Sequence, residues 1–220
     1  MRIFLLLAFL LVCMADSQAG RKKIKITTSK GIIVVELYNE TPLHRDNFLK
    51  LVKKKFYDSV LFHRVISGFM VQAGDPESKV AEPGKRYGSG GLNYKVPAEF
   101  HPDLFHRRGA LAAARDNNPE KASSSCQFYI VQGKKFKEED LRNMQKGMQS
   151  GRLFTEEQIK VYVSEGGAPH LDGNYTVFGC VLEGMDIVDQ IASAKRDQFD
   201  RPLEDIRIIK MRKVRRFLFF

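Results

Sequence analysis

The sequence predicts an all-β domain with a small number of helices. Its 220 residues are 43% hydrophobic and 28% charged, which is typical of a single globular domain. Short runs rich in β-branched and aromatic residues recur along the chain, and turn-forming residues separate them. These candidate strands are residues 23–27, 32–37, 61–66, 69–73, 110–114, 128–131, 177–182 and 206–214. Eight short strands with few helices are typical of a barrel or a sandwich.

The N-terminal segment differs in composition from the rest of the chain. The apolar run Ile3 to Cys13 is too short to span a bilayer and has the length of a signal-peptide core. Ser17-Gln18-Ala19 then places small residues at the two positions that a signal peptidase recognises. We therefore expect a signal peptide over residues 1–19 and a periplasmic or secreted domain over residues 20–220.

Two other interpretations of this segment stay open. Cys13 would be the point of attachment in a lipid-anchored protein, although Val12 is larger than the residue expected before a lipidated cysteine. An uncleaved anchor is the other alternative, and the shortness of the apolar run argues against it. No later segment of the sequence is long and apolar enough for a membrane helix, so we expect no integral membrane segment after cleavage.

A hairpin opens the domain, and a helix follows it. Residues 23–27 alternate between polar and apolar, residues 29–31 have the composition of a turn, and residues 32–37 are β-branched. Thr41 and Pro42 supply an N-cap and a proline at the first helical position. The apolar face of this helix would comprise Leu43, Phe48, Leu51 and Val52. We expect it to close one end of a barrel, and a second structural helix over residues 185–192.

Residues 134–169 interrupt the strand pattern and predict two short helices. The first would place Leu141, Met144 and Met148 on one face. The second opens with a capping box over residues 155–158, where Phe154 and Ile159 are spaced for a hydrophobic staple. We interpret this stretch as a helical insertion within the domain.

The residues best suited to chemistry lie between positions 62 and 75. A strand over residues 61–66 would place three side chains on one face: Phe62, Arg64 and Ile66. Beyond the turn at residues 67–68, the next strand would present Met70 and Gln72 on one face, close to Phe69. A cation, a thioether and an amide beside an aromatic ring suit an uncharged ligand with an apolar ring and a polarisable carbonyl or nitrogen.

This run resembles the signature of the cyclophilin family of peptidyl-prolyl cis-trans isomerases, with serine at position 67 where proline is commoner. Four further family motifs follow in order: GSGG at 88–91, GALAAA at 109–114, SCQFYI at 125–130 and HLDGNYTVFG at 170–179. The resemblance covers residues 24–214 apart from the insertion. It implies a closed eight-stranded antiparallel barrel capped by two helices, and an isomerase that needs neither cofactor nor metal.

The resemblance also implies a role for each matching residue. Arg64 corresponds to the catalytic arginine, and Gln72 to an amide beside it that holds the substrate backbone. The implied walls of the proline pocket are Phe69, Met70, Tyr129 and Leu171. The other implied substrate contacts are Gly88, Ala114, Arg115, Gln127 and Tyr175. Because the insertion leads directly to Leu171, we expect it to shape client access.

The reaction itself can be argued from the X-Pro amide. Rotation breaks the conjugation of the prolyl nitrogen, with a barrier of about 18–20 kcal/mol. A hydrogen bond from Arg64 to that nitrogen would strengthen as its lone pair localises, so it would stabilise the twisted state more than either planar state. Each roughly 1.4 kcal/mol of such stabilisation gives about tenfold in rate. We expect a monomeric isomerase that acts on proline-containing peptides and assists the folding of exported proteins.

Two other classes of function compete with this one. A proline-peptide binding or holdase module would need the apolar pocket, but not a donor at the prolyl nitrogen. Nucleic-acid binding would use the net charge of +10, yet the basic residues are spread along the chain without interleaved aromatic residues. We therefore expect no nucleic-acid partner.

Other chemistry has little support. The five histidines lack paired metal-ligand spacing, and residues 88–91 lack the lysine of a phosphate-binding loop. Residues 123–126 lack the context of a nucleophile elbow. Cys126 and Cys180 are too few for a disulfide framework, which leaves them free or paired.

Overall fold

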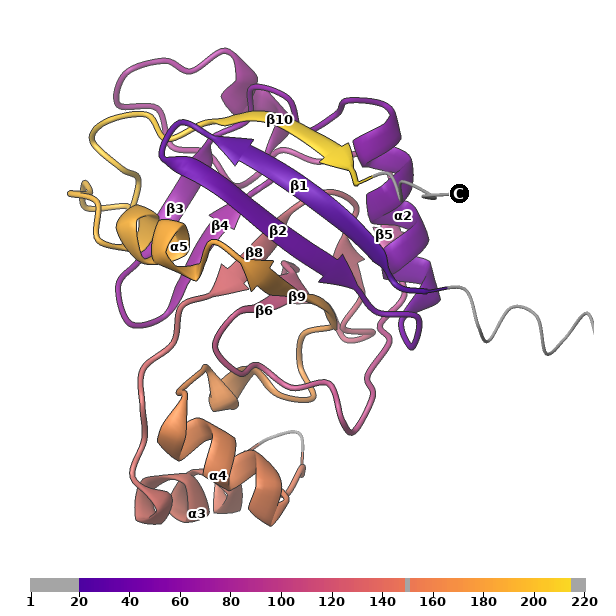
Figure 1. Cartoon of the computed structure of the whole chain (residues 1–220), viewed down its shortest axis with the longest axis vertical. Coiled ribbons are helices and arrows are strands. Elements are labelled where there is room, and N and C mark those ends of the chain that lie inside the picture. Colours follow the sequence, from indigo (N-terminus) through magenta and orange to yellow (C-terminus); the bar gives the residue numbers. More distant parts are fainter. Residues whose placement is uncertain (1–19, 149–150, 215–220) are drawn as a thin grey trace, which may run out of the picture.

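The computed structural model describes residues 20–148 and 151–214, which form a mostly β domain with four α-helices (Figure 1). The strands are β1 (Lys22–Thr28), β2 (Gly31–Leu37), β3 (Phe62–Ile66), β4 (Met70–Ala73), β5 (Lys95–Val96), β6 (Ala110–Ala113), β7 (Ser123–Ser124), β8 (Phe128–Val131), β9 (Val177–Glu183) and β10 (Ile208–Lys213). The helices are α2 (Pro42–Lys53), α3 (Glu138–Lys146), α4 (Glu156–Ser164) and α5 (Met185–Ala192). Two short 3-10 helices cover Pro76–Lys79 and Pro169–Leu171.

Eight of the strands form one antiparallel sheet in the order β10-β1-β2-β9-β6-β8-β4-β3. The sheet curls into a half-barrel, but no ladder joins its edge strands β3 and β10. The backbone there makes a single bridge between Leu61 and Arg207, with flanking hydrogen bonds such as that from the Phe62 amide to the Ile206 carbonyl, 2.8 Å. The prediction of a closed barrel is therefore wrong, because strand geometry begins only at Phe62 on one edge and at Ile208 on the other.

Most of the predicted elements are confirmed. The eight strands of the main sheet lie within two residues of their predicted bounds, and α5 covers residues 185–192 as predicted. The additional pair β5–β7 was not predicted, because a two-residue strand carries no alternation to detect.

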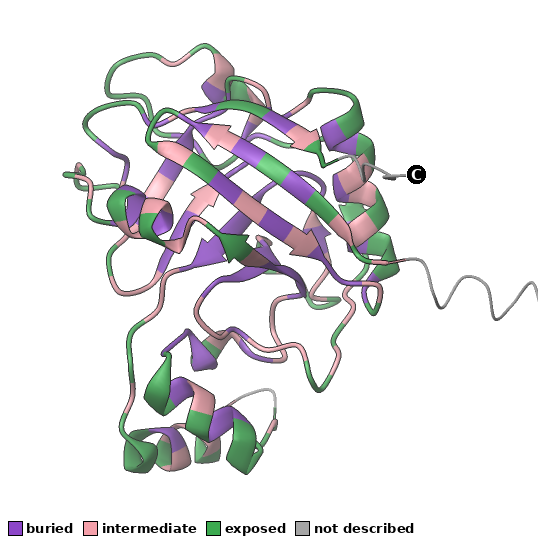
Figure 2. Ribbon diagram, in the orientation of Figure 1, coloured by how far each residue is buried: buried purple, intermediate pink, exposed green. Residues whose placement is uncertain are grey.

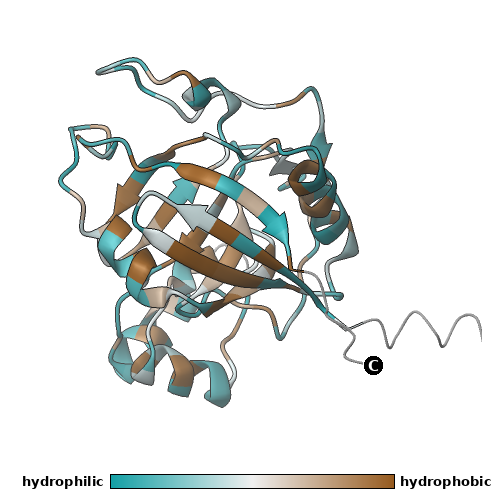
Figure 3. Ribbon diagram, turned by 45° about the horizontal axis from the view of Figure 1, so that its top comes forward, coloured by the Kyte–Doolittle hydropathy of each residue, from teal (hydrophilic) through white to brown (hydrophobic). Residues whose placement is uncertain are grey.

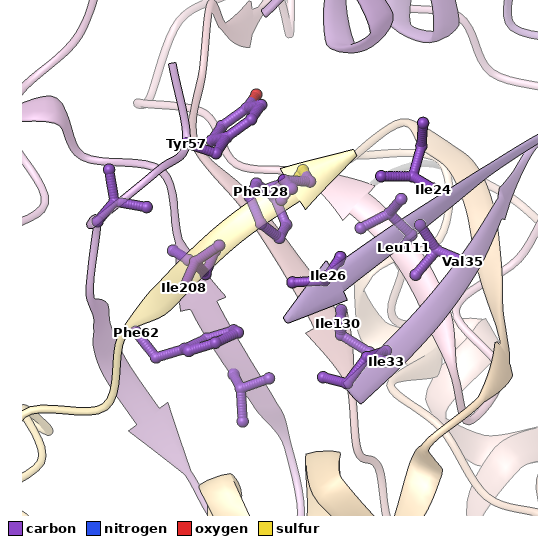
Figure 4. Close-up of a cluster of buried hydrophobic side chains, with 14 of the residues drawn as sticks. Ile24, Ile26, Ile33, Val35, Tyr57, Phe62, Leu111, Phe128, Ile130 and Ile208 are labelled. Carbon is purple, nitrogen blue, oxygen red and sulfur yellow. The ribbon is translucent and has the colours of Figure 1, made fainter. Parts of the chain in front are cut away.

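The interior of the half-barrel is an apolar core supplied by alternate residues of each strand. Figure 4 shows Ile24 and Ile26 of β1 facing the same space as Ile33 and Val35 of β2. All four are fully buried, and each such side chain contributes about 1.5–3 kcal/mol of hydrophobic stabilisation. Figure 2 shows the alternation of buried with less buried residues along both strands. Figure 3 shows that hydropathy alternates along β1, whereas β2 is hydrophobic over most of its length.

Helix α2 covers one end of this core, as predicted, with Phe48, Leu51 and Val52 buried in it, whereas Leu43, predicted on the same face, is 50% exposed. Its start differs from the prediction, because the Thr41 side chain makes no capping hydrogen bond. The Glu99 carboxylate does so instead, accepting hydrogen bonds from the amides of residues 43 and 44 at 3.0 and 2.9 Å. A long-range carboxylate thus replaces the local N-cap.

The insertion folds into a helix pair with a small apolar core of its own. Leu141, Phe154, Ile159 and Tyr162 are buried there. The predicted capping box is confirmed, since the Thr155 hydroxyl accepts from the Gln158 amide and the Gln158 side chain accepts from the Thr155 amide. Figure 1 shows the pair set to one side of the sheet, beyond the end of β8.

The two cysteines of the described residues do not form a disulfide. Cys126 and Cys180 are free and buried, although the sequence left open whether they pair. The predicted signal peptide and Cys13 lie outside the described residues. Within the described ranges, no helix combines the length and apolar character needed to cross a membrane.

Candidate active site

The candidate site lies on the outer face of the sheet formed by β3, β4, β6 and β8, of which β6 and β8 are buried on both faces. In β8, Phe128 and Ile130 point into the half-barrel, whereas Tyr129 and Val131 join a second apolar cluster outside it. Strands buried on both faces read as continuous apolar runs, as these do. The outer cluster forms the floor on which the site is built.

A β-bulge in β3 decides which side chains reach this face. The register shifts between Phe62, opposite Ala73, and Arg64, opposite Gln72. Phe62 therefore points into the inner core and Arg64 points outward. The prediction that Phe62 shares a face with Arg64 and Ile66 is wrong, because the strict alternation on which it rested is broken by this bulge.

A pocket of about 460 Å³ opens on the outer face. Ten of the eleven predicted site residues line it: Arg64, Phe69, Met70, Gln72, Gly88, Ala114, Arg115, Tyr129, Leu171 and Tyr175. Gln127 lines an adjoining hollow of about 430 Å³ instead, and Gln72 and Gly88 belong to both. The pocket also includes Arg86 and the loop at 198–200, which the sequence analysis missed because nothing local marks those residues as a site.

Arg64 lies at the edge of this pocket with part of its guanidinium unoccupied by protein contacts. Its Nη1 donates to the Gln72 side-chain oxygen at 3.4 Å, and its Nε lies 3.7 Å from an Asp200 carboxylate oxygen. The side chain is 43% exposed, so a bound substrate can reach it. A guanidinium has five N–H donors, and these contacts leave several of them for a ligand.

A chain of amide hydrogen bonds connects Arg64 to the glycine-rich rim at residues 88–91. The Gln72 amide donates to the Gln127 side-chain oxygen at 3.1 Å, and Gln127 in turn donates to the carbonyls of Gly88 and Gly90 at 2.9 and 2.7 Å. From the other side, the buried Asp75 carboxylate accepts the amides of Gly88 and Gly90 at 2.6 and 3.0 Å. A Cβ at position 90 would lie 2.1 Å from an Asp75 oxygen, so this approach requires glycine.

Aromatic and apolar side chains form the remaining walls. Met70 is buried at the bottom, and Leu171 packs against the same cluster. The ring of Phe69 lies 5.3 Å from that of His170. On the opposite rim, the Arg115 guanidinium lies 4.8 Å above the Tyr175 ring and donates to the Asn174 carbonyl at 2.8 Å. The pocket therefore has an apolar floor and a polar entrance, which suits a proline ring attached to a peptide backbone.

The hydroxyl of Tyr129 is part of a buried relay that leads from the pocket to the insertion. It lies 2.9 Å from His106 Nε2, and His106 Nδ1 lies 2.7 Å from an Asp172 oxygen. In the tautomer with the proton on Nδ1, His106 donates to Asp172 and its Nε2 accepts the hydrogen bond from the Tyr129 hydroxyl. The second Asp172 oxygen accepts the Tyr162 hydroxyl of α4 at 2.6 Å. Burial raises the pKa of Tyr129 and of Tyr162, so both hydroxyls stay protonated.

His63 is a buried residue in the lining of the same pocket, and neither of its ring nitrogens has a hydrogen bond in the described structure. Its ring faces the Gly88 backbone, where a Cβ would lie 3.5 Å from Nε2. Burial lowers the pKa of His63 to about 4, although the nearby Asp75 charge opposes this and Arg64 adds to it. His63 is therefore neutral at pH 7 and acts as a buried support of the rim.

We predict that His63 makes the protein less stable in mild acid. The folded-state pKa of about 4 lies below the ordinary value of 6.5, so the unfolded chain binds more protons between these limits. The free energy of unfolding is therefore unaffected by His63 above pH 6.5. It decreases as the pH drops toward 4, by roughly 3 kcal/mol in total. Chemical denaturation across this range measures it.

The matched variants for this prediction are His63→Leu and His101→Gln. His63→Leu should flatten the fall in stability, whereas His101→Gln, whose side chain is 39% exposed, should keep it. An equally steep fall in His63→Leu would show that other groups control the acid response.

No group of three potential metal-ligating side chains (His, Cys, Asp or Glu) comes together in residues 20–148 and 151–214.

The chain is similar to known proteins over most of its length. The family model described as "Cyclophilin type peptidyl-prolyl cis-trans isomerase/CLD" matches residues 23–213. A Staphylococcus saprophyticus protein named "Putative peptidyl-prolyl cis-trans isomerase" is 36% identical over 190 residues, which cover 84% of this chain and 88% of that protein. A protein of the same name from Staphylococcus aureus is 32% identical over 192 residues, 87% of this chain and 91% of the relative.

Solved structures show a similar fold. A cyclophilin type peptidyl-prolyl cis-trans isomerase from Cryptosporidium parvum superposes with a TM-score of 0.65 at 23% identity, covering 89% of this chain and 99% of the other. The crystal structure of that protein in the presence of the dipeptide Ala-Pro gives a TM-score of 0.64 at 24% identity, covering 88% and 99%. At these identities the structural likeness speaks for the fold alone.

Proposed function

Since the chain belongs to the cyclophilin type peptidyl-prolyl cis-trans isomerase family, and is a peptidyl-prolyl cis-trans isomerase, we propose how its site acts and which proteins it serves. Arg64 lowers the rotation barrier, and the enzyme accelerates proline-limited folding of exported proteins. The observation that carries the first part is the place of Arg64: a partly free guanidinium at the edge of a pocket whose floor is apolar.

In the proposed mechanism, the pocket holds the proline ring while the preceding carbonyl turns. Met70, Phe69 and Leu171 contact the ring, and the Gln72 side chain holds the guanidinium beside it. As the amide twists, the prolyl nitrogen regains its lone pair and accepts a hydrogen bond from Arg64. The reaction forms and breaks no covalent bond, so anchoring and this one directed donor are sufficient.

The extended substrate on either side of the proline is held by backbone and amide groups. The Gly88–Gly91 rim and Gln127 line the adjoining hollow, and Ala114 and Arg115 connect that hollow with the pocket. The Ala-Pro dipeptide used with the Cryptosporidium protein is consistent with proline-containing peptides as substrates here.

The N-terminal sequence supports export as the setting of this activity. A short apolar run followed by Ser17-Gln18-Ala19 is the pattern of a cleaved signal peptide, with attachment through Cys13 as the alternative. The test is to express the full chain in a bacterium, fractionate the cells and sequence the N-terminus. A periplasmic product that starts at Gly20 is expected. A cytoplasmic product that still carries residues 1–19 would contradict export.

The folding role is tested by refolding an exported protein whose slow phase is limited by X-Pro isomerisation. That phase, which takes tens to hundreds of seconds at 25 °C, should accelerate in proportion to the enzyme added. A holdase that only binds proline segments would raise the refolded yield without changing the rate. An unchanged rate with a raised yield would therefore favour the binding module over the folding catalyst.

A further inference from the structure

A second, smaller groove lies next to the proline pocket and is built partly by the insertion. We call it the insertion groove; its volume is about 420 Å³. Its principal lining residues are Phe69, Lys134, Phe136, Met144, Gly167 and His170. Phe136 and Met144 belong to the insertion, and Phe69 lines both this groove and the proline pocket.

Backbone hydrogen bonds hold the groove at a set position relative to the pocket. The Phe69 carbonyl accepts the amides of Gln132 and Gly133 at 2.9 and 3.0 Å, just where the chain enters the insertion. The Gly167 amide donates to the Lys134 carbonyl at 3.0 Å, which joins the two ends of the insertion. The Tyr129 relay ties α4 to the pocket floor as well. The groove is therefore preorganised, which lowers the entropy cost of binding.

The lining of the groove suits an apolar side chain. Phe69, Phe136 and His170 offer aromatic surfaces, and Met144 is a flexible thioether that adapts to side chains of different shape. Among the described residues, no carboxylate lines the groove and Lys134 is its one formal cation, 5.6 Å above the Phe136 ring. A basic client residue would be repelled there, whereas a large apolar one would be buried.

A polypeptide substrate must leave the proline pocket in two directions. One exit crosses the Gly88 rim into the hollow beside Gln127. The other passes the neighbouring rings of Phe69 and His170, whose planes are tilted by 40°, and enters the insertion groove. We propose that the insertion groove is a second client subsite, which binds a large apolar side chain close to the isomerised proline. This inference rests on the proposed isomerase site, because it takes the direction of the substrate from it.

Methionine-methyl NMR separates the two sites, since Met70 lies in the pocket and Met144 in the groove. The probes are an alanine-rich peptide with one proline and a series in which a single phenylalanine replaces alanine at successive positions on both sides. The alanine peptide should shift the Met70 signal alone. Phenylalanine at one or two positions on one side should shift Met144 as well. Shifts of Met70 without Met144 throughout the series would overturn the subsite, whereas no shift of Met70 would overturn the proposed isomerase site.

Kinetics on the same peptides provide the second measurement. The best phenylalanine peptide should exceed the alanine peptide by about tenfold in kcat/KM, as expected when much of an aromatic side chain is buried. Met144→Glu should remove most of that ratio. Val163→Glu, an exposed position of α4 outside the groove, is the matched control and should keep it. Equal ratios in the wild type and Met144→Glu would overturn the proposal.

Discussion

Replacing Arg64 by alanine should lower kcat/KM for X-Pro isomerisation by about 10²–10³-fold, the effect of removing one preorganised hydrogen-bond donor from a transition state. The loss should fall mainly on kcat, since the proline ring still binds among Phe69, Met70 and Leu171. NMR exchange on a short X-Pro peptide at several peptide concentrations measures kcat and kcat/KM, with the uncatalysed peptide as the baseline.

The controls for this prediction distinguish three causes of lost activity: loss of the positive charge, loss of the directed hydrogen-bond donors, and loss of the folded state. Arg64→Lys keeps the cation but loses the fork of donors, so its activity should lie between those of the wild type and Arg64→Ala. Lys53→Ala removes a cation on the exposed face of α2 and should leave the rate unchanged. Because Arg64 is 43% exposed, the alanine variant should melt close to the wild type. A folded Arg64→Ala enzyme of full activity would contradict the proposed role.

Replacing Asp172 by alanine should cost about 3–5 kcal/mol of unfolding free energy, the largest stability effect expected outside the main core. Asp172 accepts the His106 amide, the His106 ring and the Tyr162 hydroxyl, and its side chain is fully buried. Without it, three donors lose their acceptor in a site that water does not reach. For a domain of this length, the melting temperature should fall by about 10 °C.

Tyr162→Phe is the matched comparison, because it removes one donor and leaves the carboxylate paired with His106. It should cost about 1.5 kcal/mol. Since the relay ends on the Tyr129 hydroxyl in the proline pocket, Asp172→Ala should also raise KM, whereas a purely structural defect elsewhere would leave KM unchanged. Equal melting temperatures for Asp172→Ala and the wild type would show that the relay does not hold the insertion to the domain.

Much of the site could be predicted because its residues lie in short continuous motifs. Arg64, Met70 and Gln72 come from one hairpin, so local spacing brought them to attention, whereas Tyr129 was identified through the family motif at residues 125–130. The capping box at Thr155 and the bounds of α5 were predicted for the same reason, since both depend on contacts a few residues apart. The roles of the individual site residues stay predictions until the kinetics are measured.

What local pattern could not predict depends on contacts between distant parts of the chain. The bulge at Phe62 breaks the alternation and turns that side chain inward, and Glu99 rather than Thr41 caps α2. Arg64 and Asp200 come together only when the chain has folded. The Glu99 and Asp200 contacts join residues dozens of positions apart, and no periodicity in the chain specifies these contacts or the bulge.

For this protein, the order of short apolar and polar runs was enough to indicate a mostly β fold and its helices, and the resemblance of its motifs to the cyclophilin family indicated an isomerase site. Tertiary packing alone decided that no ladder joins β3 and β10 and that the insertion forms a groove beside the pocket. It also decided that hydrogen bonds through His106 and Asp172 connect the Tyr129 hydroxyl with α4. The reason is physical: secondary structure follows from neighbours along the chain, whereas sheet closure and buried hydrogen bonds depend on which distant groups meet once water is excluded.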